Sequence, residues 1–322
     1  MSRTVRELGL ALQTNKRPGE YAALARPADD AGFGVVTVYN DLWYQPALPA
    51  LLEIAAATSL ARIGPSCLNP FTLHPVEIAG QIAALDTASG GRAFLGLVAG
   101  AWLDSLGIDQ SGRVIAVREA WEIVRRLLAG DDRGFEGERF SLPVGARLRY
   151  PVERSEVSLL VGSWSSKLTA FAAEAANELK VGGSANPDLV SVMRERVANP
   201  EVGLVFGAVT VVDEDGKRAR DLARREVALY LPVIGHHDPT VALDPELLER
   251  LRSEGERGAA LISDGVLGRF AFAGSPAEVA EQAEAVLDAG AARVDFGTPH
   301  GIDEGKGVDL LCRSVLPRLG VA

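Results

Sequence analysis

The sequence ARIGPSC at residues 61–67, PVEIAGQIAALDTAS at residues 75–89 and RAFLGLVA at residues 92–99 predicts a strand, a helix and a second strand. The two outer stretches are short and mostly apolar, as in strands that are buried on both faces of a parallel sheet. The middle stretch begins with proline, which favours the first helical turn, and carries apolar residues at helical spacing. This strand–helix–strand order is the repeating unit of parallel α/β folds.

The same alternation extends over the rest of the chain. The expected strands cover residues 6–12, 35–39, 61–67, 92–99, 157–161, 179–181, 203–212 and 293–296. The expected helices cover residues 19–31, 46–58, 75–89, 113–128, 167–177, 187–197 and 308–319. Eight strands with helices between them specify a closed parallel barrel. We therefore predict an α/β protein with a (β/α)8 TIM-barrel fold, in a single domain over residues 1–322.

Two segments lengthen this barrel. Residues 134–142 are expected to form a small hairpin, followed by a loop over residues 143–154. Residues 213–290 lie between the seventh and eighth strands and are too many for one connection, so we expect a helical insertion there. Ser275 and Pro276 predict the start of the last inserted helix, as its N-cap and its first helical residue.

The composition indicates an ordinary folded protein. The 322 residues are 47% hydrophobic and 24% charged, which suits one enlarged barrel. The net charge of −10 opposes binding to nucleic-acid phosphates and to anionic membranes. We therefore expect neither nucleic acid nor membrane as a partner.

The location is expected to be cytoplasmic. Two cysteines, Cys67 and Cys312, are too few for a disulfide framework, which favours a reducing compartment. No stretch approaches the roughly 18 apolar residues that a membrane helix needs. Residues 1–9 lack the hydrophobic segment of a secretion signal.

Barrel enzymes carry their active residues at the carboxyl ends of the strands, and this rule selects candidate site residues. The candidates for cofactor binding are Asn40, Ser66, Cys67, Asn69, Gly100, Ala101, Gly162, Gly182, Gly183 and Ser184. The candidates for catalysis are Asp41, Trp43, Trp102 and His300.

These residue types suit a planar cofactor with a phosphate tail. Glycine lets a ligand approach the backbone, whose N–H groups can bind phosphate, and tryptophan offers a flat apolar wall. The alternative is that the glycines only form tight turns between strands and helices. For Asp41, the catalytic interpretation is a group that positions substrate or relays a proton, and the alternative is a cap for the helix that begins near Pro46.

Other kinds of site lack their residues. The four histidines are not combined with carboxylates at the spacing of a metal site, so no metal is expected. The sequence contains no Gly-x-Ser-x-Gly elbow and no P-loop. Cys67 has no evident general base for a nucleophilic role, and Cys312 is expected in the core. The chain therefore favours chemistry that a bound cofactor supplies.

Two motifs carry a family resemblance. Residues 61–75, with Asn69-Pro70 and His74-Pro75, and residues 85–92, with Leu85-Asp86 and Ser89-Gly90-Gly91-Arg92, resemble the luciferase-like family. The resemblance is strongest to the branch that uses the deazaflavin coenzyme F420, which includes methylene-tetrahydromethanopterin reductases. It extends over nearly the whole chain, through residues 34–41, 100–107, 162–167, 181–187, 270–276 and 295–301.

The resemblance implies where a cofactor would lie. Family members carry a non-prolyl cis peptide bond at the end of the third strand, as a bulge against the cofactor ring, and the matching bond is Ser66–Cys67. Gly100-Ala101 and Gly182-Gly183-Ser184 would contact the cofactor tail. Asn40 and Asp41 fall near the ring, where relatives often carry aspartate and then histidine. The resemblance also allows a homodimer, since relatives are often dimers, but the sequence does not decide the oligomeric state.

One departure leaves the substrate open. Ala11 occupies a position of the first strand at which methylene reductases carry a glutamate. Together with Asn40 and Asp41, this difference argues against a pterin-methylene substrate.

The resemblance implies an F420-dependent oxidoreductase. Such an enzyme transfers a hydride between the deazaflavin and a C=N, C=C or alcohol carbon of a small organic substrate, while the protein orients the reactants and supplies a proton. The first alternative is an FMN-dependent luciferase-like monooxygenase. The second is a flavin-binding barrel without turnover, because a fold does not fix a function.

Overall fold

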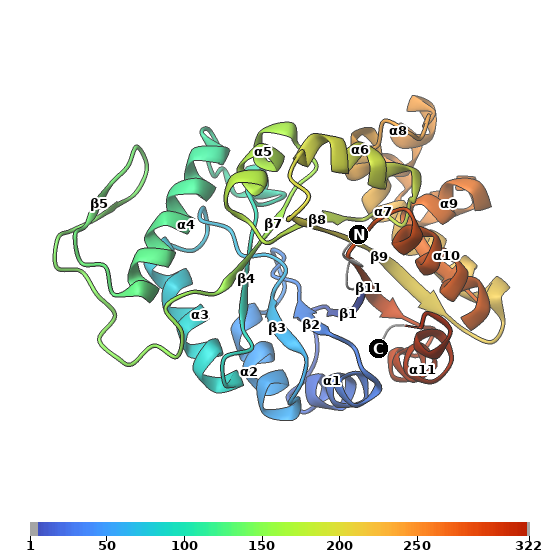
Figure 1. The fold of residues 1–322 in the computed structure, drawn as a ribbon. Coiled ribbons are helices and arrows are strands. Elements are labelled where there is room, and N and C mark those ends of the chain that lie inside the picture. Colours follow the sequence, from blue (N-terminus) through green and yellow to red (C-terminus); the bar gives the residue numbers. More distant parts are fainter. Residues whose placement is uncertain (1–5, 321–322) are drawn as a thin grey trace. The chain divides into compact units, whose positions relative to one another are not determined.

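The computed structural model describes residues 6–320, which form two compact units (Figure 1). The first unit comprises residues 12–29 and 35–179, and the second comprises the described parts of residues 1–11, 30–34 and 180–322. Four of the eight expected strands lie in the first unit, and the other four lie mainly in the second.

The first unit is a parallel sheet with a helix after each strand. Its strands are β2 (Val35–Val38), β3 (Arg62–Pro65), β4 (Phe94–Leu97) and β7 (Ser158–Gly162). Its helices are α1 (Glu20–Ala31, whose last two residues belong to the second unit), α2 (Ala47–Ala57), α3 (Pro75–Ser89), α4 (Arg113–Ala129) and α5 (Ser166–Ala175). Parallel ladders join β2 to β3 and β4 to β7, and parallel bridges from Ile63 to Ala93 and from Leu68 to Leu97 join β3 to β4. The carboxyl ends of these four strands therefore lie along one edge.

The second unit has the strand order β1–β11–β9–β8, with β10 also paired to β9. These strands are β1 (Glu7–Leu12), β8 (Glu178–Gly182), β9 (Gly203–Val212), β10 (Ala271–Gly274) and β11 (Arg293–His300). The helices are α6 (Asp188–Val197), α7 (Gly216–Ile234), α8 (Pro245–Glu254), α9 (Asp264–Phe270), α10 (Pro276–Asp288) and α11 (Glu304–Leu310). The pairs β1–β11, β11–β9 and β10–β9 are all parallel.

Most of the predicted elements are confirmed. Helix α3 and strand β9 have the predicted bounds, and the hairpin forms from β5 (Phe135–Glu136) and β6 (Ser141–Leu142). Ser275 caps α10 in a capping box with Glu278, and Pro276 is the first helical residue. The other boundaries differ by a few residues, as the fraying of element ends would suggest.

Three expectations need correction. The insertion over residues 213–290 contains the strand β10 as well as helices. The sequence did not predict this strand, because a four-residue apolar run shows no periodicity. The last strand continues past residue 296 to His300, through an irregular register after Gly297. The closing helix does not run uniformly over residues 308–319: it changes to a π turn at Leu311 and a 3-10 turn at Leu316, where Pro317 cannot donate an α-helical hydrogen bond.

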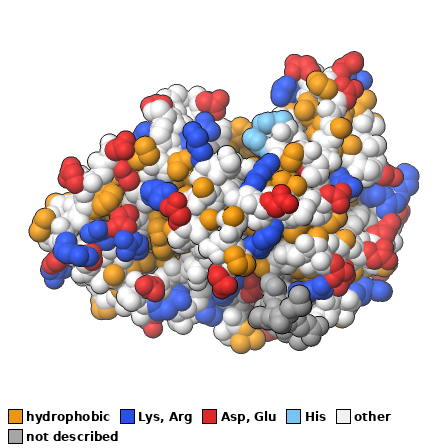
Figure 2. All heavy atoms as spheres, turned by 45° about the horizontal axis from the view of Figure 1, so that its top comes forward, with side chains coloured by type: hydrophobic (Ala, Val, Ile, Leu, Met, Phe, Trp, Pro, Cys, Tyr) orange, Lys and Arg blue, Asp and Glu red, His pale blue; other side chains and the backbone are white. Residues whose placement is uncertain are grey.

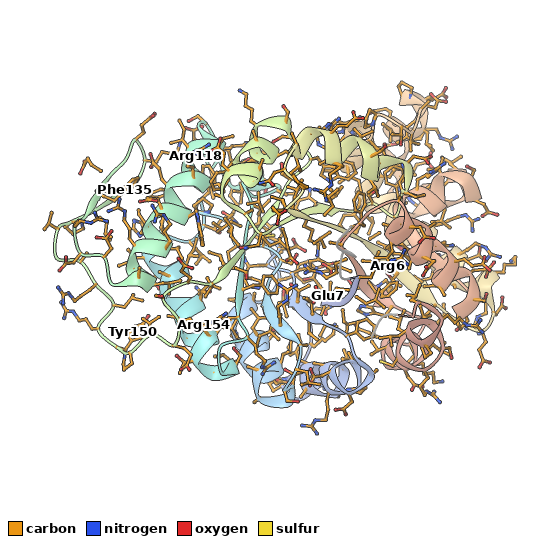
Figure 3. The ribbon with its side chains drawn as sticks, in the orientation of Figure 1. Arg6, Glu7, Arg118, Phe135, Tyr150 and Arg154 are labelled. Carbon is orange, nitrogen blue, oxygen red and sulfur yellow. The ribbon has the colours of Figure 1, made fainter. Side chains whose placement is uncertain are left out.

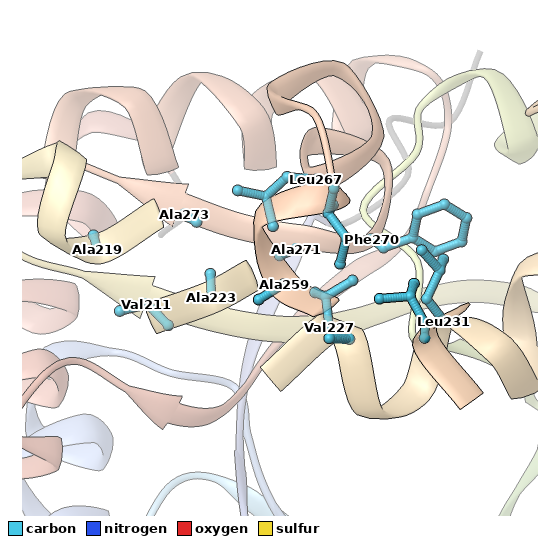
Figure 4. Close-up of a cluster of buried hydrophobic side chains, with 13 residues drawn as sticks. Val211, Ala219, Ala223, Val227, Leu231, Ala259, Leu267, Phe270, Ala271 and Ala273 are labelled. Atoms are coloured by element: carbon cyan, nitrogen blue, oxygen red, sulfur yellow. The ribbon is translucent and has the colours of Figure 1, made fainter. Parts of the chain in front are cut away.

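The insertion has its own apolar core (Figure 4). Helix α7 packs the small residues Ala219 and Ala223, together with Val227 and Leu231, into this core. Phe270 from α9 and Ala271 and Ala273 from β10 lie in the same cluster. Because β10 adds directly to β9, the insertion is built onto the sheet of the second unit rather than suspended from it.

The residues of the family motif hold helices to strands in the first unit. The Arg92 guanidinium donates to the carbonyl oxygens of Ala55, Thr58 and Ala61, at 3.1, 2.9 and 2.7 Å. Buried Asp86 accepts from the Ala93 N–H at 3.1 Å and from Arg154 Nε at 3.0 Å (Figure 3). These contacts lie at the amino end of β4, away from the strand ends at which a barrel site is expected. The motif therefore identifies the scaffold and not the substrate.

Charged side chains on the face shown in Figure 2 are mixed in sign, with acidic and basic groups interspersed. Ion pairs along helices include Lys217 with Asp221 and Arg250 with Glu254. Exposed pairs of this kind contribute little to stability, about 0–1 kcal/mol each.

A buried group of charges in the second unit is of a different kind. Asp295 accepts from Lys180 Nζ at 2.7 Å and from Arg293 Nε at 2.8 Å, and all three side chains are buried. Glu7 extends the group through Arg293 Nη1 at 3.3 Å. Burial would raise the pKa of Asp295, but Arg293 and Lys180 outweigh burial and hold that pKa below its ordinary value. A Cβ at Gly9 would stand 2.1 Å from Asp295 Oδ1, so the missing side chain leaves room for the carboxylate.

We predict that Asp295→Asn lowers the free energy of unfolding by about 3–5 kcal/mol, because it removes the buried anion that pairs with both Lys180 and Arg293. Urea unfolding at neutral pH measures this loss. A depressed pKa stabilises the fold above the ordinary aspartate pKa and loses that effect as pH falls, so the difference between variant and wild type should shrink in acid.

The matched control for this variant is Glu249→Gln. Glu249 pairs with Arg252 on the exposed face of α8, so the change should alter stability by less than about 0.5 kcal/mol. Equal effects of the two substitutions would contradict the importance of the buried group.

Candidate active site at the strand ends

In the first unit, Asn40 and Asp41 follow β2 and have different roles. Asn40 Oδ1 accepts from the Ala47 N–H at 3.1 Å, so Asn40 and not Asp41 satisfies the start of α2. Asp41 is half-buried and accepts from Gln13 Nε2 at 2.9 Å. Burial raises the pKa of Asp41, and the Gln13 hydrogen bond opposes only part of that shift. Asn40 therefore satisfies the first N–H of α2, whose N-cap residue is Pro46, and Asp41 is left as a carboxyl group with a perturbed pKa.

The end of β3 carries Ser66, Cys67 and Asn69. The Ser66–Cys67 peptide bond is cis, as the resemblance implied. Asn69 is buried, and its Oδ1 accepts from the N–H groups of Phe71 and Thr72, which fixes the following turn. A Cβ at Gly162, at the end of β7, would lie 3.2 Å from Cys67 Sγ. Gly162 therefore leaves room for the Cys67 side chain, which is half-buried.

The loop after β4 is held firmly on its inner side. Gly100 has a φ of +87°, and a Cβ there would lie 2.6 Å from a Leu103 methyl group and 3.3 Å from Asn69 Cγ. Leu103 is fully buried, and Gln110 Nε2 donates to the carbonyl oxygens of Ala99 and Gly100 at 3.0 and 3.2 Å. Between these anchors, Ala101 and Trp102 are exposed.

Three of the four predicted catalytic residues have left-handed backbones. Among the described residues other than glycine, only Trp43 (φ 70°), Trp102 (φ 57°), Ala198 (φ 52°) and His300 (φ 66°) have a positive φ. This conformation costs roughly 1–2 kcal/mol for a residue with a Cβ and is often found at functional sites. Trp43 is 78% exposed and Trp102 is 41% exposed, so burial of the indole rings does not offset this cost.

The loop after β8 contains Gly182, Gly183 and Ser184. A Cβ at Gly182 would meet nothing within 4 Å, so the backbone there faces open space. Gly183 has a φ of +80° and lies against Ile234 at the end of α7. The N–H groups of Gly183 and Ser184 both donate to the Gly207 carbonyl oxygen, at 2.6 and 3.2 Å. These two N–H groups are therefore engaged within the protein, and the space beside Gly182 is what a cofactor tail could use.

His300 lies at the end of β11 and is fully buried. Its Nε2 lies 3.2 Å from the Phe296 carbonyl oxygen and its Nδ1 lies 3.3 Å from Glu304 Oε1. Both ring nitrogens thus have partners in β11 and α11. This geometry suits a side chain that fixes the loop after β11.

The structure groups the predicted residues by unit. Asn40, Asp41, Trp43, Ser66, Cys67, Asn69, Gly100, Ala101, Trp102 and Gly162 lie in the first unit, while Gly182, Gly183, Ser184 and His300 lie in the second. Contacts with Cys67 and Asn69 bring Gly162 and Gly100 to the end of β3.

The sequence analysis missed two residues of these loops. Gln13 lies just beyond β1 and orients Asp41; the strand-end rule, had it been applied to the first strand, would have selected it. Asn186 follows β8 in an Asn-Pro sequence that reads as a plain turn, yet it is fully buried. Only its tertiary contacts reveal its importance.

The described residues offer neither a metal-binding cluster nor a membrane-spanning helix. Residues 6–320 contain no cluster of three or more histidine, cysteine, aspartate or glutamate side chains that could hold a metal ion. In the same residues, no helix combines the length and the apolar character that a membrane crossing demands. Cys312 is buried as expected, and burial raises the pKa of its thiol to about 11.

The fold and the strand-end loops define a family. The sequence pattern of the luciferase-like monooxygenases matches residues 4–293, and the chain belongs to this family. Among its relatives is the 5,10-methylenetetrahydromethanopterin reductase of Methanopyrus kandleri, which is 27% identical over 96% of this chain and 97% of that protein. Another is the F420-dependent glucose-6-phosphate dehydrogenase of Nocardia farcinica, which is 25% identical over 94% of both chains.

Solved structures agree on the fold. The coenzyme F420 dependent tetrahydromethanopterin reductase of Methanopyrus kandleri superposes with a TM-score of 0.86, at 23% identity, over 98% of this chain and 99% of that one. The oxygenating constituent of 3,6-diketocamphane monooxygenase from Pseudomonas putida, in complex with FMN, gives a TM-score of 0.68 at 16% identity, over 97% and 98% of the two chains. The predicted (β/α)8 TIM-barrel fold is thereby confirmed.

We predict that Asp41→Asn stabilises the protein above the folded-state pKa of Asp41. A raised pKa means that the folded state binds the proton more tightly than the unfolded state, so ionised Asp41 destabilises the fold as pH rises through that window. The amide keeps an acceptor for Gln13 Nε2 and carries no charge. Thermal unfolding should show a higher midpoint for the variant at mildly alkaline pH and no difference in acid.

Asp109→Asn is the control with the opposite sign. Hydrogen bonds from the Ser111 side chain and backbone lower the pKa of exposed Asp109, so its charge favours the fold. If Asp41→Asn lowers the midpoint as Asp109→Asn should, the burial of the Asp41 charge is not unfavourable.

Proposed function

We propose that this protein is an F420-dependent oxidoreductase that transfers a hydride between the deazaflavin and a carbon atom of a small, uncharged organic substrate. The observation that carries this proposal is the end-to-end similarity to the reductase and dehydrogenase relatives, whose names state or imply F420 chemistry. One domain over residues 1–322 is part of the proposal.

The strand-end loops fit the cofactor. Gly100 and Ala101 after β4, and Gly182 and Gly183 after β8, present accessible backbone with little or no side chain. We assign the cofactor tail to these two loops and the ring to the ends of β2 and β3, at Asn40, Ser66, Cys67 and Asn69. When bound, F420 supplies a carbon that accepts or donates a hydride.

The chain's own residues would manage the proton. Asp41 is the half-buried carboxyl group at the end of β2, its pKa is raised by burial, and Gln13 orients it. A carboxyl group with a raised pKa can hold a proton nearer neutral pH and deliver it to a developing oxygen or nitrogen anion of the substrate. Turnover should therefore fall in Asp41→Asn while cofactor affinity holds. We assign His300 to the support of its loop.

The loops also indicate the class of substrate. Residues 39–46, 66–75, 99–112 and 163–166, which follow the strands of the first unit, contain three aspartates and no lysine or arginine. Residues 183–188, 213–216 and 301–305, which follow β8, β9 and β11, also lack lysine and arginine. Only the loop after β1 carries Lys16 and Arg17, and Lys16 Nζ is buried beside Asn15 Oδ1 at 3.1 Å.

The arginines that contact these loops from other segments, such as Arg139 at the Ser111 carbonyl oxygen and Arg269 at Asn186 Oδ1, are already hydrogen-bonded there, so a substrate with a phosphate or carboxylate would find few available cations. Exposed Trp43 and Trp102 instead offer apolar walls on either side of the β3 end, since β2 and β4 flank β3 in the sheet. A buried anion without a partner is strongly unfavourable. We therefore propose an uncharged substrate with a flat apolar part, unlike the glucose 6-phosphate named for one relative.

Fluorescence titration with F420 and with FMN tests the cofactor. We expect a Kd for F420 in the micromolar range or tighter, and a weaker Kd for FMN. Tighter binding of FMN would contradict the proposal and favour the monooxygenase alternative.

Gly183→Val tests whether the loop after β8 contacts the cofactor. The new side chain would strike Ile234 Cδ1, 2.3 Å from the added Cβ, so Ile234→Ala is combined with it to make room. We expect weaker F420 binding in the double variant and wild-type binding in Ile234→Ala alone. Gly183→Ala combined with Ile234→Ala is the control for backbone strain, because any side chain is strained at a φ of +80°. Weaker binding with Val than with Ala then indicates contact with the cofactor.

Saturation-transfer NMR with the F420-loaded protein tests the substrate class. We expect 2-acetylnaphthalene to bind at least about tenfold more tightly than 2-naphthoate, a difference of about 1.4 kcal/mol, because the loops lack a cation for the carboxylate. Trp102→Ala should weaken binding of the neutral probe. Leu60→Ala, which alters a residue that is 77% exposed between α2 and β3, should not.

Binding of the anion at equal or higher affinity would contradict an uncharged substrate. Failure of both probes to bind would contradict the proposed aromatic walls.

A cytoplasmic location and a homodimer also stay predictions.

A further inference from the structure

A single buried amide, Asn186, joins three segments of the second unit. It lies four residues beyond β8 and is fully buried. Its Nδ2 donates to Asp238 Oδ2 at 2.8 Å and to Thr240 Oγ1 at 2.7 Å, both in the connection between α7 and α8. Its Oδ1 accepts from Arg269 Nη1 of α9 at 2.5 Å. One side chain thus links the loop after β8 to two separate parts of the insertion.

The loop after β8 is fastened to the insertion at neighbouring residues as well. The Ala185 N–H donates to the Arg269 carbonyl oxygen at 3.0 Å, and the Asn186 N–H donates to Ser184 Oγ at 3.2 Å. Gly183 lies against Ile234, the last residue of α7. The conformation of residues 183–186 therefore depends on the position of the insertion, and the reverse also holds.

We propose that Asn186 is a positioning residue for the cofactor loop, and that binding of the cofactor tail and ordering of the Asp238–Thr240 connection are coupled through its amide. This inference rests on the proposed function, because it takes Gly182 and Gly183 to contact the tail of F420. A coupling between two sites is reciprocal: if the insertion positions the loop, a ligand on the loop must restrain the insertion.

Hydrogen exchange of the wild-type protein tests the coupling without any substitution. The Thr240 N–H donates to Asp238 Oδ1 at 2.9 Å and reports directly on the connection. Addition of F420 should slow its exchange by at least about threefold. The Glu246 N–H is a matched control: it donates to Asp244 Oδ1, also at 2.9 Å, in the same insertion but with no bond to Asn186. Its exchange should not change.

A swap of two side chains tests the role of the amide. Asn186→Asp places two carboxylates face to face, and we expect F420 affinity to fall at least about tenfold. Asn186→Asp combined with Asp238→Asn restores one amide and one carboxylate to the pair, and keeps an acceptor for Arg269. The double variant should recover F420 affinity to within about threefold of wild type.

Thr240→Val is the milder variant, should the first one fold poorly. It removes one acceptor of the Asn186 amide, and we expect F420 affinity to fall by a few fold with the thermal midpoint nearly unchanged.

The outcomes separate two failures. If the wild-type protein does not bind F420, the proposed function fails. If it binds F420 but Thr240 exchange does not respond, or if folded Asn186→Asp and Thr240→Val bind F420 as the wild type does, Asn186 serves stability only and this inference is overturned.

Discussion

The ion triad around Asp295 is the interaction on which the second unit depends. Lys180 on β8 and Arg293 and Asp295 on β11 place three charges where neither water nor helix termini can solvate them. The attraction between these charges offsets the cost of removing them from water only when they lie close together. Gly9 on the adjacent β1 leaves the room that the Asp295 carboxylate needs. The spacing of the strands, the glycine at position 9 and the three charges therefore depend on one another. Together they fix the positions at which the loops after these strands begin.

The sequence was sufficient for the scaffold and only partly sufficient for the site. Apolar periodicity and caps predicted α3, β9 and the start of α10 because local interactions decide them. Strand β10 was not predicted, because four consecutive apolar residues show no periodicity and its pairing with β9 is a tertiary contact. The strand-end rule selected Asp41 and Trp102, but it could not show that Asn40 accepts from the first N–H of α2 or that Gln13 donates to Asp41. Those assignments depend on hydrogen bonds between residues distant in sequence.

The loops after β4 and β8 differ in how each is held within its own unit. The loop after β4 is anchored locally, by buried Leu103 and by Gln110, so exposed Trp102 stands on a rigid base. The loop after β8 is anchored remotely, through Asn186, to an insertion with its own apolar core. A rigid wall suits selection of a substrate by shape. A loop that is bonded to a separate core can move together with that core when a ligand binds.

Arg92 and Asp86 fasten helices to strands at the amino end of β4 and touch none of the strand-end loops described above. A lineage of such proteins could replace every residue that meets a substrate and still keep these contacts. The residues that identify the family and the residues that determine the reaction therefore lie in separate parts of the chain. Two proteins that share the scaffold residues are homologous. Only the loop residues, beginning with Asp41, Trp43 and Trp102, indicate whether they also catalyse the same reaction.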